Sequence, residues 1–260
     1  MKKRLLILVL FFLQQSTSAF ADFVKGANAY QSGDYATAAK EWELAANEGN
    51  TRAQYLLGLM YFHGKGCTRD YKAAFKWLEM AANQGVARAQ FNVGRMYEKG
   101  LGTPQDLESA NKWYVSAASN GIVAAQSLLG VAYYEGINVK QDYKTAFKWL
   151  KLAADQGRDR AQFMLGSMYY EGKGVNQDYK LAFGFFNQAA EQGYAPAQFS
   201  LIAKQGDAES QFKMGLMYDN GFNVKQDYSA AIEWYRLAAE KGYAPAQNNL
   251  GSIHRRGRGV

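Results

Sequence analysis

Apolar residues along this chain recur at helical spacing, in runs that glycines interrupt at regular places. In the copy marked by Ala53, a first run covers about 51–63 and stops at Gly64-Lys65-Gly66. Paired glycines supply the backbone angles that a helix exit needs. A second run follows Asp70, whose side chain suits a helix N-cap, and it ends at Gly85. The pattern predicts two helices joined as a hairpin.

The hairpin pattern repeats with a period of 36 residues. The motif Ala-Gln-x-x-x-Gly-x-x-Tyr marks the first helix of successive copies, at Ala53, Ala89, Ala125 and Ala161. An aromatic residue of the second helix keeps the same step, at Trp77, Trp113, Trp149 and Phe185. One hairpin cannot bury its apolar face alone, so the copies must stack on one another. The sequence therefore predicts an all-α solenoid of stacked 36-residue helical hairpins.

Small and polar residues at fixed places support this prediction. Aspartates recur as expected N-caps of the second helices, at Asp70, Asp106, Asp142, Asp178 and Asp227. A glycine inside a helix costs roughly 1 kcal/mol relative to alanine, so a repeated one needs a reason. We expect close contact between helices at the interior glycines, which are Gly58, Gly94, Gly130, Gly166, Gly215 and Gly251.

The repeat resembles the Sel-one-like repeat (SLR), a relative of the tetratricopeptide repeat. The shared pattern is Ala-Gln-x-x-Leu-Gly-x-x-Tyr-x-x-Gly-x-Gly-Val-x-x-Asp-Tyr-x-x-Ala-x-x-Trp-x-x-x-Ala-Ala-x-x-Gly, and it covers nearly all of the chain after residue 21. The resemblance implies hairpins that stack into a right-handed α-solenoid around a concave groove that binds other proteins. For exported bacterial members, it also implies contacts with host cells or with cell-envelope machinery.

The N-terminus has the parts of a secretory signal peptide. Basic residues at 2–4 precede an apolar run over 5–13, and Ala19-Phe20-Ala21 offers small residues to a signal peptidase. The run is well short of the roughly 20 residues that span a bilayer. We expect cleavage after Ala21, export to the periplasm or out of the cell, and no integral membrane span afterwards. An uncleaved anchor is the alternative.

The spacing of the motifs divides the chain into predicted segments. The expected boundaries are 1–21 signal peptide, 22–52 N-terminal partial repeat or cap, 53–196 four regular repeats, 197–209 a degenerate single-helix unit, 210–245 a repeat, and 246–260 a truncated repeat or C-terminal cap. The degenerate unit follows from Ala197-Gln198, because the equivalent Ser210-Gln211 comes only 13 residues later. We expect one helix and a joint there.

Charge and metal-ligand content narrow the classes of function. The formal net charge of +7 falls to +4 once Lys2, Lys3 and Arg4 leave with the signal. That excess is spread out, so nucleic acid is not an expected partner. Cys67 is the only cysteine, which excludes an intrachain disulfide. With only two histidines beside it, the sequence predicts neither a metal site nor a cofactor.

Catalysis is not expected either. Some cysteine-rich relatives of the resembled family act on β-lactams, and Ser-x-x-Lys occurs here at Ser109–Lys112 and Ser210–Lys213. Neither copy is accompanied by the Ser-Asp-Asn or Lys-Thr-Gly motifs that would complete such a site. The predicted function is an adaptor that binds a protein or an extended peptide. A β-lactam or cell-wall hydrolase of the same repeat class is the alternative.

An aromatic stripe on the first helices is the predicted contact surface. It lies beside the face that meets the hairpin partner, at positions spaced i, i+4 and i+7. By the relationship to tetratricopeptide repeats, it should line the concave side. The predicted partner-binding residues are Tyr55, Phe62, Phe91, Tyr134, Phe163, Tyr170 and Phe212. The alternative is that these aromatics pack adjacent first helices together, and both interpretations can hold at once.

Overall fold

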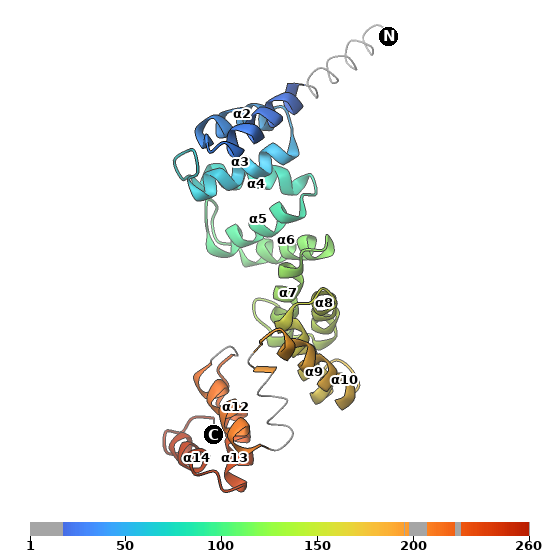
Figure 1. Cartoon of the computed structure of the whole chain (residues 1–260), viewed down its shortest axis with the longest axis vertical. Helices are drawn as coiled ribbons and strands as arrows, with labels where there is room; N and C mark the ends of the chain where they lie inside the picture. The colour runs from blue at the N-terminus through green and yellow to red at the C-terminus, as the bar shows by residue number, and fades with distance from the viewer. Residues whose placement is uncertain (1–17, 195, 198–206, 222–224, 260) are drawn as a thin grey trace. The chain divides into compact units, whose positions relative to one another are not determined.

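The computed structural model of the chain describes residues 18–194, 196–197, 207–221 and 225–259. Every element of regular secondary structure in these ranges is a helix, which confirms the predicted all-α class (Figure 1). The chain divides into two compact units, Met1–Gln126 (unit 1) and Ser127–Val260 (unit 2). The division falls inside α7 (Val123–Glu135).

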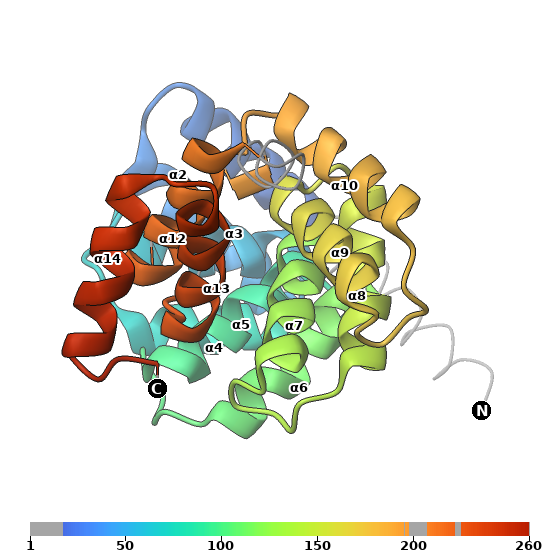
Figure 2. The ribbon, with the colours of Figure 1, turned by 90° about the horizontal axis from the view of Figure 1, so that it is seen from below.

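The helices follow one another in hairpins, each with a first and a second helix. Unit 1 has a helix over residues 18–31, then α2 (Tyr35–Asn47), α3 (Thr51–His63), α4 (Tyr71–Asn83), α5 (Ala87–Lys99) and α6 (Leu107–Ser119). Unit 2 has most of α7, then α8 (Tyr143–Asp155), α9 (Asp159–Glu171), α10 (Tyr179–Glu191), α12 (Ala208–Asn220), α13 (Tyr228–Glu240) and α14 (Ala244–Arg255). First helices pack on the second helices that follow them, as α3 does on α4 and α9 on α10. Figure 2 shows α8, α9 and α10 side by side.

Local chemistry sets the ends of these helices, as the sequence predicts. The Asp70 carboxylate accepts hydrogen bonds from the backbone N–H groups of Lys72 and Ala73 at 2.8 and 3.1 Å. The other predicted aspartates cap their helices in the same manner, at Asp106, Asp142, Asp178 and Asp227. At the far end of α3, Gly64 is left-handed with φ 67°, a conformation that glycine adopts without steric cost.

Most of the interior glycines lie at close helix contacts, as expected. A Cβ atom on Gly58 would lie 2.7 Å from Cγ of Leu78, in the second helix of the same hairpin. A Cβ atom would likewise crowd the side chain 20 positions later if it were added to Gly94, Gly130, Gly166 or Gly215. The expectation is wrong for Gly251, which has no heavy atom of the described residues within 4 Å of such a Cβ. The described residues after α14, 256–259, form no second helix that could pack against it.

The glutamine of the Ala-Gln motif links successive hairpins. Gln90 Nε2 donates to the carbonyl oxygen of Ala82, in the preceding second helix, at 3.2 Å. Gln90 Oε1 accepts from Nδ2 of Asn120, at the end of the following second helix, at 2.9 Å. Gln54 makes the same pair of contacts with Ala46 and Gln84. A buried amide must be satisfied by such partners, and here they join three consecutive helices.

The N-terminal hairpin has a shorter loop than the later hairpins, over residues 32–34, but it keeps the same internal contact. Trp42 is 3% exposed, and its indole N–H donates to the carbonyl oxygen of Phe23 at 3.2 Å. Trp42 lies eight positions after Asp34, as Leu78 does after Asp70. Its ring therefore takes the place of Leu78 and packs on Gly26. Trp77 lies seven positions after Asp70, so Trp42 is one position later in its own hairpin, and this offset turns its ring toward the glycine.

Two predicted segments lie largely outside the described residues. They are the signal peptide, of which only 18–21 are described, and the degenerate unit at 197–209, of which 198–206 are not. In the part of the chain that the structure describes, no helix is long and apolar enough to cross a bilayer.

Candidate interaction site

Two cavities contain residues of the predicted aromatic stripe, one in each unit. The cavity of unit 2 measures about 440 Å³ and lies among α7, α8, α9 and the α12–α13 hairpin. We call it the tyrosine cavity, because Tyr134, Tyr143, Tyr194 and Tyr218 line it. The cavity of unit 1 measures about 110 Å³ and lies between α3 and α5. We call it the α3–α5 pocket.

A hydrogen-bonded tyrosine forms one side of the tyrosine cavity. The Tyr134 hydroxyl, in the last turn of α7, donates to Oε2 of Glu171 at 3.3 Å. Its ring meets the Tyr143 ring edge to face, with centroids 5.4 Å apart. Burial, followed by the charge of Glu171, raises the pKa of Tyr134 to about 12. This phenol therefore stays protonated and remains a hydrogen-bond donor at neutral pH.

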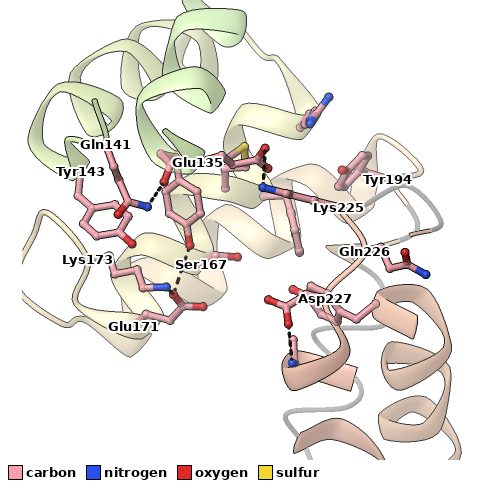
Figure 3. Close-up of a pocket in the computed structure, with 16 residues that line it drawn as sticks. Glu135, Gln141, Tyr143, Ser167, Glu171, Lys173, Tyr194, Lys225, Gln226 and Asp227 are labelled. Atoms are coloured by element: carbon pink, nitrogen blue, oxygen red, sulfur yellow. Dashed lines mark hydrogen bonds and ion pairs between the residues drawn. The ribbon is translucent and has the colours of Figure 1, made fainter. Parts of the chain in front are cut away.

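Lys173, in the loop after α9, completes this side (Figure 3). Its Nζ lies 5.6 Å from the centroids of both tyrosine rings and 2.8 Å from Oε2 of Glu171. Burial alone would lower the pKa of Lys173, but its hydrogen bond to Glu171 and the neighbouring charges outweigh burial and raise it. The ammonium group is thus held as a cation against two aromatic rings.

The same lysine contact occurs in unit 1, where it joins two hairpins. Lys65 Nζ lies 4.4 and 4.0 Å from the ring centroids of Tyr30 and Tyr35, and it donates to the Tyr30 hydroxyl at 2.8 Å. Lys65 and Lys173 are the middle residues of their Gly-x-Gly loops, 108 positions apart. The glycine after each lysine packs on a tyrosine carbonyl, so a Cβ on Gly174 would lie 2.5 Å from that of Tyr143. The glycine contact also occurs at Gly102, which follows Leu101 and not a lysine, so the glycine seats the loop on the preceding hairpin and the lysine adds its contact with the tyrosine rings.

The remaining lining of the tyrosine cavity is polar and mixed in charge. Arg160, Met164 and Ser167 of α9 line one part of it, and Lys225 and Asp227 line another. Figure 3 shows Lys173 and Glu171 on one side of the view and Lys225 and Tyr194 on the other. The cationic groups in the lining are Arg160, Lys173 and Lys225, and the acidic ones are Glu135, Glu171 and Asp227. The cavity therefore offers donors and acceptors without a net charge of either sign.

The α3–α5 pocket has a different character. Its floor is apolar and comprises Leu59, Phe62, Leu78, Met96 and Leu101. Its other lining residues are His63, Asn92, Arg95 and Lys99. Arg95 and Lys99 are exposed side chains of α5, whereas Leu78 reaches the floor from α4 and is fully buried. The pocket thus joins an apolar base to a basic rim.

The structure distributes the seven predicted partner-binding residues over different surroundings. Phe62 lines the α3–α5 pocket, whereas Tyr134 and Phe163 line the tyrosine cavity. The other four, Tyr55, Phe91, Tyr170 and Phe212, line neither cavity. Every one of the seven is at least partly buried.

Ring contacts show how these aromatics pack. Phe163 is only 6% exposed, because its ring meets those of Phe186 and Tyr194 at centroid distances of 5.6 and 5.4 Å. Phe91 and Phe212 meet Tyr114 and Tyr235 in the same way. Packing thus accounts for these three residues, while their contact with a partner stays a prediction.

The residues that the sequence analysis missed are mainly charged. Lys173 and Arg160 line the tyrosine cavity, and Lys99 lines the α3–α5 pocket. The recurrence of lysine at 65 and 173, each with a tyrosine 30 residues earlier, was the available signal for the loop contact. Arg95 is in the stripe by spacing, at the position of Leu59 one repeat earlier, but it is not aromatic.

The serine–lysine pairs have ordinary structural roles. The Ser109 hydroxyl donates to Oδ2 of Asp106 at 2.6 Å, and Lys112 pairs with Glu108 at 2.7 Å. Lys213 pairs with Glu209 at 2.7 Å.

Within the described ranges, no group of three His, Cys, Asp or Glu side chains is placed to hold a metal ion. Burial, and then the charge of Glu43, raises the pKa of the Cys67 thiol.

Comparison with known proteins agrees with the repeat architecture. The Sel1 repeat model matches residues 51–86, 87–122, 123–157, 159–194, 208–243 and 244–260. The chain belongs to the Sel1 repeat family. The predicted solenoid of helical hairpins is thereby confirmed as the Sel1 type. Sel1 repeat proteins are generally non-catalytic scaffolds for protein–protein interaction.

Two solved structures are similar to this Sel1 repeat protein over most of its length. One is c5321, a protective antigen of uropathogenic Escherichia coli strains with an SLR fold, at 34% identity and a TM-score of 0.68. The match covers 92% of this chain and 57% of c5321. The other is a Sel1 repeat protein from Oxalobacter formigenes, at 31% identity and a TM-score of 0.60, with 91% of this chain and 89% of that one covered. No curated protein sequence matches the chain.

Proposed function

We propose that this Sel1 repeat protein is a non-catalytic scaffold that binds a protein segment in extended conformation, without a cofactor. The observation that carries the proposal is the lining of the tyrosine cavity. An extended peptide backbone presents one donor and one acceptor per residue, and the cavity offers both kinds of group beside aromatic rings. Aromatic residues and arginine are enriched at protein interfaces.

The rest of the site supports the same kind of ligand. The tyrosine rings are held by neighbouring rings and by Lys173, so binding costs little side-chain entropy. Ser167, Met164 and Arg160 lie on consecutive turns of α9 and form a continuous strip along the cavity. Such a strip matches a chain segment better than it matches a compact small molecule.

We also propose that the protein is exported, with its signal peptide cleaved after Ala21. The basic, apolar and small-residue parts of segment 1–21 support export. The similar protein c5321 is described as a protective antigen, which is consistent with a role outside the cytoplasm. N-terminal sequencing of the protein from cell fractions should give Asp22 as the first residue, and an intact Met1 in the cytosolic fraction would contradict export.

Position-specific crosslinking tests the binding proposal. A photo-crosslinking residue at position 167 lies in the tyrosine cavity, and one at the exposed position 119 of α6 lies in neither cavity. We expect position 167 to capture, from the native cell envelope, a protein that position 119 does not capture. Equal capture at both positions would contradict binding in the cavity.

A further inference from the structure

The α3–α5 pocket combines an apolar floor with unpaired positive charge. Arg95 and Lys99 lie four residues apart on α5, so their side chains share one face of the helix. Among the described residues, no ion pair involves either side chain. Glu98, the acidic residue of α5, is not in the pocket lining and accepts a hydrogen bond from the Tyr114 hydroxyl at 2.7 Å.

The surrounding face of the two first helices extends the positive charge. Arg88 lies seven residues before Arg95, and Arg52 lies eleven residues before His63, so both fall on the faces that line the pocket. Arg52 and Arg88 are exposed. No acidic residue lines the pocket. An anionic ligand would therefore meet several cations and no carboxylate of the lining.

We infer that the α3–α5 pocket binds an acidic protein segment that carries one apolar anchor side chain. The anchor would pack on Leu59, Phe62 and Met96, while carboxylates beside it would pair with Arg95 and Lys99. A volume of about 110 Å³ suits a single side chain, so the rest of the segment must lie over the basic rim. The inference rests on the proposed scaffold function and names the chemistry of a ligand for unit 1.

The two cavities are selective in different ways. Cations and acids are balanced in the lining of the tyrosine cavity, whereas the lining of the α3–α5 pocket holds only basic charged groups. Arginine pairs with a carboxylate through two parallel hydrogen bonds, so the side chains of Asp and Glu in a protein segment suit Arg95. Like-charge repulsion would exclude basic segments.

Peptide binding to the full chain tests the inference. The probe is a fluorescent peptide, blocked at both ends, with one leucine between two pairs of glutamates. We expect binding that weakens at least about tenfold when the leucine is replaced by serine, or the glutamates by lysines. The double variant Arg95→Glu/Lys99→Glu should reduce the affinity for the probe by about the same factor. The milder variant Arg95→Gln/Lys99→Gln should reduce it somewhat less.

Matched charge changes control for net charge. Lys40→Glu/Lys72→Glu makes the same change at exposed positions of α2 and α4 that do not line the pocket, and it should bind the probe within about twofold of the wild type. An equal loss in this control, or equal binding of the lysine peptide, would overturn the inference. Circular dichroism should show the same helical signal for all variants.

The result separates this inference from the proposed function. Ser167→Trp, which fills the tyrosine cavity, should leave peptide binding to unit 1 unchanged. If Arg95→Glu/Lys99→Glu binds the probe like the wild type while Ser167→Trp still loses a captured partner, the pocket assignment fails and the scaffold function stands.

Discussion

Single glycine residues set how closely the two helices of a hairpin approach. Gly58 leaves no room for a Cβ, since Cγ of Leu78 would lie 2.7 Å away and its backbone nitrogen 3.1 Å away. Gly251 occupies the same position of the repeat with open space around it. The two residues therefore have the same helix propensity but opposite steric surroundings.

Substitution of each glycine by alanine should give opposite results. Gly58→Ala gains about 1 kcal/mol in helix propensity but incurs overpacking of about 1–3 kcal/mol, so the free energy of unfolding should fall. Gly251→Ala gains helix propensity without overpacking, so it should raise the free energy of unfolding by about 0.5–1 kcal/mol. Urea unfolding followed by circular dichroism measures both. A rise for Gly58→Ala would show that the contact is loose.

Capped helices are the elements that the sequence predicts best. The expected first helix over about 51–63 is observed as Thr51–His63. Asp70 and Gly64 act within a few residues of their own position, so their roles could be inferred from neighbours in the sequence. The cap of α8 is of this kind, because the Asp142 carboxylate accepts from the Thr145 hydroxyl at 2.6 Å and from two backbone N–H groups.

The cap of α8 should make stability depend on acid. The hydrogen bond from the Thr145 hydroxyl, then the one from its backbone N–H, lowers the pKa of Asp142 in the folded state. The stability that this cap contributes is present above the ordinary aspartate pKa of about 4 and is lost as the pH falls through the folded value. The melting temperature of the wild type should therefore fall more steeply below pH 4 than that of Asp142→Asn.

Asparagine is the matched control, because it also caps helices but does not titrate in this range. Near neutral pH the two proteins should melt at similar temperatures. Parallel curves of melting temperature against pH would show that Asp142 does not contribute through its charge.

Contacts between hairpins could not be predicted from the sequence. The Ala-Gln motif is visible, yet the role of Gln90 depends on Ala82 and Asn120 in two other helices. The positive rim of the α3–α5 pocket likewise depends on how α5 packs on α3. The aromatic stripe was predicted from spacing alone, which cannot distinguish a ring in a cavity from one that packs on a neighbour, as Phe91 does on Tyr114.

The C-terminal hairpin has its own core. The buried cluster around Tyr235 and Ile253 draws on α12, α13 and α14. The spacing between the motifs before this hairpin is shorter than the repeat period. Ser210-Gln211 follows Ala197-Gln198 after 13 residues instead of 36. Stability in repeat proteins comes largely from interfaces between neighbouring repeats. The C-terminal helices are therefore expected to depend on few such interfaces.

Hydrogen exchange of the full chain tests this expectation. Amides of α12–α14 should open at lower free energy than those of α3–α6, because about three stacked repeats are needed for independent stability. Limited proteolysis should cut first near Lys204, between the two closely spaced motifs. Uniform protection on both sides of Lys204 would instead show that the C-terminal helices are fully integrated into the array.

We propose that this Sel1 repeat protein binds a protein segment in the tyrosine cavity. The most direct test of this claim is the affinity of the protein captured through position 167 for two variants of the full chain, measured by calorimetry. Ser167→Trp places a large side chain in the cavity, and Ser119→Trp makes the same change on the exposed end of α6. We predict that Ser167→Trp weakens binding at least about tenfold and that Ser119→Trp leaves it unchanged. Equal affinities for the two folded variants would contradict the claim.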